Sequence, residues 1–105
     1  MSEKPTRLYL AGPMTGHADL NFPAFHAEAA RLRDRGYEVI NPAEINVFDG
    51  VEPASWEACM RADIRELVTC EGIVTLDGWE ASRGASLEVH IAQALGMFVA
   101  RSNTL

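Results

Sequence analysis

Apolar positions along the chain follow two different periods. Four short runs are mostly or wholly apolar, as expected of strands buried on both faces of a sheet. They lie at 8–11, 37–40, 72–76 and 97–100. Three longer segments repeat apolar residues at helical spacing. They run from 21 to 36, from 55 to about 69 and from 87 to 95. Because strands and helices alternate, the pattern predicts a small α/β domain with helices on both faces of a parallel sheet of about four strands.

The first predicted helix has residues typical of both helix ends. Asn21 is a plausible cap, and the following residues suit a first helical turn. Arg31, Arg33 and Arg35 place positive charge in the last turn, where it complements the helix dipole. We expect these three arginines to form a solvated helix end and not an anion-binding site.

Length and composition limit the kind of protein. The 105 residues predict one domain over 1–105, and 48% hydrophobic with 23% charged residues is an ordinary globular balance. The net charge of −6 argues against a nucleic-acid polymer or an anionic membrane surface as partner, although a small anionic ligand needs only a local positive patch. No segment reaches the roughly 20 apolar residues of a membrane span, and no signal core follows the N-terminus. We therefore expect a cytoplasmic protein.

The two cysteines, Cys59 and Cys70, lie among apolar residues at a spacing that matches no metal or redox motif. They are expected to be free structural thiols in a reducing compartment. The chain also lacks a metal-ligand cluster or cofactor motif, so we expect neither a metal nor a cofactor.

Two turns rich in small residues follow the first and third predicted strands, at 12–16 and 78–84. The first is neither a Gly-x-Gly-x-x-Gly fingerprint nor a P-loop. Ligands of parallel α/β sheets bind at the carboxyl ends of strands, where both turns would lie. Glu88 falls in or near the first turn of the third helix, where the helix dipole favours a negative charge. The alternative is an ordinary loop followed by a solvated Glu88.

A second carboxylate and a tyrosine accompany Glu88 in this prediction. Asp63 borders the apolar stripe of the second helix, and Tyr9 is near the carboxyl end of the first strand. Two carboxylates whose pKa values are pushed apart suit chemistry at an acetal-like carbon, with one as nucleophile and the other handling the leaving group. The helix N-terminus would keep Glu88 ionised, and burial would raise the pKa of Asp63. The alternatives are a core Tyr9 and a rim Asp63 paired with a neighbouring arginine.

The segment 43–55 has no clear period and contains Gly50, Pro53 and several acids. Long connections in small domains often have a function. It is either a lid, a wall facing the ligand, or a surface loop.

Four segments carry a family resemblance. They are Leu-Tyr-Leu-Ala-Gly-Pro at 8–13, Asn-Phe-Pro-Ala-Phe at 21–25, Tyr-Glu-Val-Ile-Asn-Pro at 37–42 and Ser-x-Gly-x-x-x-Glu at 82–88. Together they resemble the nucleoside 2-deoxyribosyltransferase-like superfamily, in particular its small phage and bacterial branch, related to 2'-deoxynucleoside 5'-phosphate N-hydrolases. The resemblance implies a flavodoxin-like (Rossmann-like) three-layer sandwich and cleavage of an N-glycosidic bond.

The resemblance also implies roles for individual residues. Glu88 is similar to the family's nucleophile at C1', Tyr9 to the residue that orients it, and Asp63 to the carboxylate that binds sugar hydroxyls or handles the base's proton. Seven further positions are implied in substrate binding: Gly12, Pro13, Met14, Thr15, Ser82, Arg83 and Gly84.

One departure concerns phosphate. The monophosphate hydrolases carry a Ser and an Arg where this chain has Pro13 and Thr15, so Thr15 or Arg83 would have to recognise a 5'-phosphate. In these relatives a second subunit completes the site, which implies a homo-oligomer. We thus expect hydrolysis or transfer on a small nucleoside or nucleotide. The alternative is a non-catalytic nucleotide-metabolite binding protein or sensor on the same fold.

Overall fold

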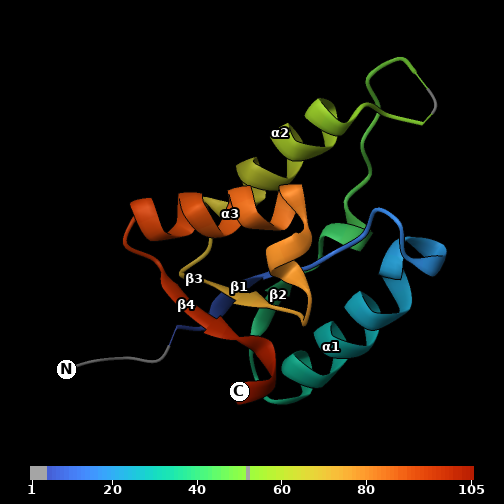
Figure 1. Ribbon diagram of the computed structural model, residues 1–105. Helices are drawn as coiled ribbons and strands as arrows, with labels where there is room; N and C mark the ends of the chain where they lie inside the picture. The colour runs from blue at the N-terminus through green and yellow to red at the C-terminus, as the bar shows by residue number, and fades with distance from the viewer. Residues whose placement is uncertain (1–4, 52) are drawn as a thin grey trace.

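Four parallel strands form the centre of the molecule (Figure 1). The computed structural model describes residues 5–51 and 53–105. The strands are β1 (Arg7–Ala11), β2 (Glu38–Ile40), β3 (Gly72–Thr75) and β4 (Phe98–Arg101), in the spatial order β2-β1-β3-β4. The helices are α1 (Phe22–Asp34), α2 (Trp56–Leu67) and α3 (Arg83–Ala94). This arrangement confirms the predicted α/β fold with its small parallel sheet.

Helices cover both faces of the sheet, as Figure 1 shows. Alternate residues of a strand point to opposite faces, so each buried strand contributes to two separate cores. On one face Leu8 and Leu10 pack with α1. On the other face Tyr9 and Ile73 pack with α3 and with Leu67 at the end of α2. The result is a flavodoxin-like three-layer sandwich in which β1, at the centre, sends Tyr9 towards α3.

The third helix starts earlier than its apolar pattern predicted. It begins at Arg83, and the Ser82 hydroxyl caps it by accepting a hydrogen bond from the Ala85 backbone N–H at 3.2 Å. Its first turn holds only small or polar residues, which gives no apolar signal. Glu88 therefore lies in the second turn of α3 and not in the first.

Two of the three arginines expected at a solvated helix end, Arg31 and Arg33, have tertiary partners, whereas Arg35, just after α1, is exposed as expected. Arg31 donates to the backbone carbonyls of Ser102 and Leu105 at 2.9 and 3.2 Å. Arg33 pairs with the Glu44 carboxylate at 2.8 Å. These contacts fasten α1 to the turn after β4 and to the segment after β2. The periodicity of α1 could not reveal partners so distant in sequence.

Both cysteines are free thiols, and Cys70 is buried in the core. Over residues 5–51 and 53–105, no helix combines the length and apolar character needed to cross a membrane.

Candidate active site

A tyrosine and a glutamate meet inside the protein between β1 and α3. The Tyr9 hydroxyl donates a hydrogen bond of 2.6 Å to Glu88 Oε2. Tyr9 is fully buried, and only 5% of the Glu88 surface is exposed. The sheet holds Tyr9 on the face that α3 covers, and Glu88 lies on the side of α3 that packs against the sheet. A buried carboxylate with so short a hydrogen bond is held in one orientation.

Asp63 approaches the same hydroxyl from α2. It is half-buried, and the Tyr9 hydroxyl favours its ionised form. The negative charge of Asp63 in turn acts on Glu88, because it disfavours a second charge nearby. The structure therefore brings together the three residues predicted for catalysis, from β1, α2 and α3. Sequence spacing alone does not show this convergence, because the three residues belong to separate elements.

Burial gives both carboxyl groups unusual protonation behaviour. Desolvation raises the pKa of Glu88 to about 8; the Tyr9 hydroxyl opposes this shift and Asp63 adds to it. Desolvation also raises the pKa of Asp63 to about 6, against the effect of Tyr9. The expectation that the helix N-terminus keeps Glu88 ionised was wrong, because Glu88 lies one turn further along and is buried. The two pKa values are separated as expected, but Asp63 is the stronger acid.

The helices α2 and α3 come very close together at Gly84, one helical turn before Glu88. A Cβ atom placed on Gly84 would lie 3.1 Å from Met60 Sδ and 3.8 Å from Trp56 Nε1. Gly84 thus allows α3 to approach α2. The neighbouring Arg83 lies over the indole of Trp56, with its Cζ 3.7 Å from the ring centroid. Ser82, Arg83 and Gly84 all lie at this contact, as the capping residue and first turn of α3.

Trp56 and Met60 were not among the predicted site residues, although both lie at the contact with Gly84. Their spacing to Asp63, at i, i+4 and i+7 of α2, was the available signal. The spacing predicts a core-facing stripe whose burial raises the pKa of Asp63, but it does not show that the two side chains reach α3.

The two predicted ligand loops touch each other. A Cβ on Gly12 would lie 2.8 Å from Leu76 Cβ, and a Cβ on Gly78 would lie 3.5 Å from Pro13 Cγ. Gly12 is therefore required for the close approach of the segments that follow β1 and β3. Pro13 is buried in this contact, which gives it a packing role.

The rest of the first loop is associated with the α1 face of the sheet, opposite the face that holds Tyr9 and α3. Met14 packs against the α1 core, and Thr15 is exposed. The loop is fastened by the Asn21 side chain, which donates to the Pro13 carbonyl at 2.9 Å. No hydrogen bond or ion pair joins Met14 or Thr15 to Glu88 within the described part of the chain.

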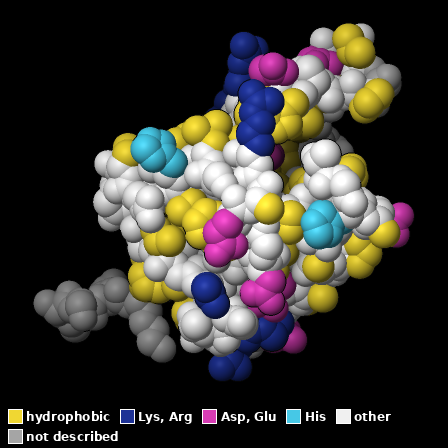
Figure 2. Space-filling model, viewed as in Figure 1, with side chains coloured by type: hydrophobic (Ala, Val, Ile, Leu, Met, Phe, Trp, Pro, Cys, Tyr) yellow, Lys and Arg dark blue, Asp and Glu magenta, His cyan; other side chains and the backbone are white. Residues whose placement is uncertain are grey.

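The segment after β2 projects from the body of the protein. Asp49 organises it by accepting hydrogen bonds from the backbone N–H groups of Val51 and Ser55 at 3.1 and 3.0 Å. Phe48 and Val51 are 77% and 62% exposed, and Figure 2 shows hydrophobic side chains on this projection. Ser55 then caps α2. The role of the segment 43–55, as a lid, a wall facing the ligand or a surface loop, stays a prediction.

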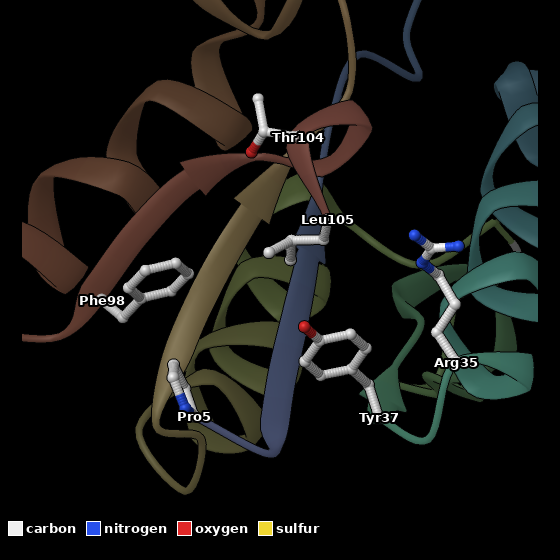
Figure 3. Close-up of a pocket in the computed structure, with 6 residues that line it drawn as sticks. All are labelled: Pro5, Arg35, Tyr37, Phe98, Thr104 and Leu105. Atoms are coloured by element: carbon white, nitrogen blue, oxygen red, sulfur yellow. The ribbon is translucent and has the colours of Figure 1, made fainter. Parts of the chain in front are cut away.

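Two cavities stand out within residues 5–51 and 53–105, and the catalytic candidates line neither of them. The larger cavity, about 660 Å³, lies between the residues that follow α1 and the turn after β4 (Figure 3). Its lining is Pro5, Arg35, Tyr37, Phe98, Thr104 and Leu105. The smaller, about 200 Å³, is lined by residues 75–80 and Arg101, after β3 and β4. The Tyr9–Glu88 pair is enclosed by packed side chains, since Tyr9 is fully buried and only 5% of the Glu88 surface is exposed.

Residues 5–51 and 53–105 contain no group of three or more His, Cys, Asp or Glu side chains placed to hold a metal ion. The chemistry available to the pair is proton transfer and nucleophilic attack by a carboxylate.

The fold and site define an α/β protein with a buried tyrosine–carboxylate pair at the centre of its sheet. The chain belongs to the family described as "Domain of unknown function (DUF4406)", which it matches over residues 6–101. It is also similar to a solved structure described as a conserved protein from Enterococcus faecalis V583, with a TM-score of 0.65 and 28% identity. That match covers 92% of this chain and 63% of the other, so this chain spans less than two thirds of the other's length. No curated protein matches the chain.

Proposed function

We propose that the protein breaks the N-glycosidic bond of a small nucleoside or nucleotide, by hydrolysis or by transfer to another base, with Glu88 as nucleophile at C1'. The observation that supports this most is the 2.6 Å hydrogen bond from the Tyr9 hydroxyl to Glu88, beside Asp63, whose ionised form the same hydroxyl favours. The resemblance of the 8–13 and 82–88 segments to the nucleoside 2-deoxyribosyltransferase-like superfamily supplies the substrate class.

The protonation of the pair suits this chemistry. With pKa values of about 6 and about 8, Asp63 and Glu88 together hold one proton near neutral pH. A nucleophile and an acid acting on the leaving group need one proton between them. With these pKa values the shared proton resides on Glu88, which is the unproductive position. The Tyr9 hydroxyl is hydrogen-bonded to Glu88 and acts electrostatically on Asp63, so it is the group placed to pass a proton to Asp63 while accepting the proton of Glu88.

The reaction then proceeds in two balanced steps. Ionised Glu88 forms a bond to C1' as the bond from C1' to the base nitrogen breaks, and the base takes the proton of Asp63. Asp63 next accepts a proton from water or from a second base. That acceptor attacks C1' and releases Glu88 as a carboxylate.

The burial of Glu88 favours a second candidate function. A carboxyl group that is neutral at pH 7 and enclosed by packed side chains is a poor nucleophile unless the substrate changes its environment. The alternative protein binds a nucleotide metabolite without cleaving it and acts as a sensor. It would show saturable binding and no product, even at high protein concentration.

We also propose that the protein works in the cytoplasm as a homo-oligomer with a small-molecule ligand. Large apolar side chains on the exposed surface support self-association, because their contact would remove them from water. They include Leu20, Phe48, Val51 and Leu95.

The test is product formation measured by chromatography. The protein is incubated with ribo- and deoxyribonucleosides and their 5'-monophosphates, with and without a second free base. Free base from one substrate identifies a hydrolase, and a new nucleoside only with the second base identifies a transferase. Glu88→Gln should abolish either product, whereas Glu80→Gln, on an exposed residue of the preceding turn, should not. Activity retained in Glu88→Gln would exclude Glu88 as the nucleophile.

A further inference from the structure

We propose that the indole face of Trp56 is the platform on which the base of the substrate stacks, and that Arg83 covers this face until the base displaces it. This inference rests on the proposed function, since it assigns the base-binding part of the same site.

The position of Trp56 follows from the packing of α2 on α3. Trp56, Met60 and Asp63 lie along one stripe of α2. Gly84 and Glu88 are four residues apart and share a face of α3. Trp56 and Met60 contact the Gly84 end of this face. The indole is therefore about one helical turn, roughly 5 Å along α3, from the proposed nucleophile. A base attached to C1' extends over such a distance.

The arginine over Trp56 is held only weakly. Arg83 is exposed and stacks on the indole of Trp56. Among residues 5–51 and 53–105, no ion pair or hydrogen bond holds its guanidinium. An exposed cation–π contact is weaker than the stacking of a nucleobase on an aromatic side chain. A base can therefore replace the guanidinium at little cost.

The wall beside Trp56 can adapt to the base. Met60 closes the space between the indole and Gly84, with its Sδ only 3.1 Å from a Cβ at Gly84. Methionine is flexible and polarizable, and it contacts aromatic rings favourably. Moving Arg83 and the end of Met60 would open a path to Glu88 without displacing either helix. This explains how a carboxylate with 5% exposure can reach a ligand.

The test uses Trp56 as its own reporter. The chain has two tryptophans, so Trp79→Phe leaves Trp56 as the only indole. In this background we would titrate deoxyadenosine and deoxycytidine, with 2-deoxyribose as the probe that lacks a base, and follow fluorescence and heat of binding. We expect the nucleosides to change Trp56 emission saturably and 2-deoxyribose to leave it unchanged.

Variants separate the platform from its cover. Trp56→Leu should weaken nucleoside binding by about tenfold or more, because base stacking is lost, whereas Trp56→Phe should retain most of it. Arg83→Gln should bind nucleosides about two- to fivefold more tightly, because no cation–π contact has to be broken. Arg61→Gln, on an exposed residue of α2, is the matched control and should bind like the parent.

The outcomes separate this inference from the proposed function. Calorimetric binding without a change in Trp56 emission would overturn the platform, and so would a loss of binding in Arg83→Gln. Turnover with an unchanged KM in Trp56→Leu would also overturn it and leave the function standing. Stacking on Trp56 without product from any substrate would support the platform and refute the enzyme. Absence of nucleoside binding by both methods would refute both.

Discussion

Replacing Glu88 by Gln should stabilise the folded protein at alkaline pH. Burial raises the pKa of Glu88 from 4.5 to about 8. Between these values the unfolded chain releases a proton that the folded chain retains. The free energy of unfolding therefore falls as the pH rises through this window. The stabilising effect of the raised pKa is complete below about pH 4.5 and lost as the pH approaches about 8.

The size of the effect follows from the shift. At about 1.4 kcal/mol per pKa unit, the change from 4.5 to about 8 corresponds to on the order of 5 kcal/mol. The glutamine side chain in Glu88→Gln cannot ionise, and its oxygen can still accept the Tyr9 hydrogen bond. The variant should thus gain up to this amount over the natural protein near pH 8 and nothing near pH 4. Since domains are stable by about 5–15 kcal/mol, the gain is easily measured.

Urea unfolding followed by circular dichroism at about pH 4, 6 and 8 measures the difference. Glu80→Gln is the control, because Glu80 is exposed and should show no such pH dependence. A difference that stays constant with pH would refute the argument. So would a Glu88→Gln protein that is less stable than the parent at pH 8, since Glu88 would then be ionised in a favourable environment.

Three further predictions concern the neighbours of Glu88 and the first loop. Tyr9→Phe removes a hydrogen bond that lowers the pKa of Glu88, so this pKa should rise and the upper limb of the pH–rate profile should move to higher pH, with a lower kcat; an unchanged profile would contradict the role of Tyr9. Asp63→Asn removes the charge that raises the pKa of Glu88, so the carboxyl titration of Glu88 by NMR should move to lower pH; a shift upward would show that Asp63 does not act on it. Gly12→Ala should destabilise the protein by about 1–3 kcal/mol in urea unfolding, because the new Cβ would lie 2.8 Å from Leu76 Cβ; full stability would mean that the two loops separate easily.

The fold could be predicted from the sequence because strands buried on both faces are short continuous apolar runs. β1 and β3 are of this kind, and the helical stripes between the runs gave the order of elements. The start of α3 could not be predicted, because the Arg-Gly-Ala-Ser turn has no apolar residue to mark it. Its small residues serve the packing against α2, which is a tertiary requirement.

Part of the site could also be predicted, because the apolar pattern gives the order of strands and helices. Tyr9 and Glu88 belong to elements whose meeting follows from the parallel topology. The protonation state of Glu88 could not be predicted from the sequence, because the pKa of its carboxyl group depends on how completely Tyr9, α2 and α3 exclude water. The stacking of Arg83 on Trp56 joins the first turns of two helices, and no sequence spacing indicates it.

The central claim is that Glu88 forms a covalent bond to the sugar. The most direct measurement is intact-protein mass spectrometry after incubation with a 2'-deoxy-2'-fluoronucleoside, a probe that slows release of the sugar. The account predicts a mass increase equal to the sugar, located on the peptide that contains Glu88 and absent in Glu88→Gln. Release of free base by Glu88→Gln at the rate of the natural protein, with no sugar on that peptide, would contradict it.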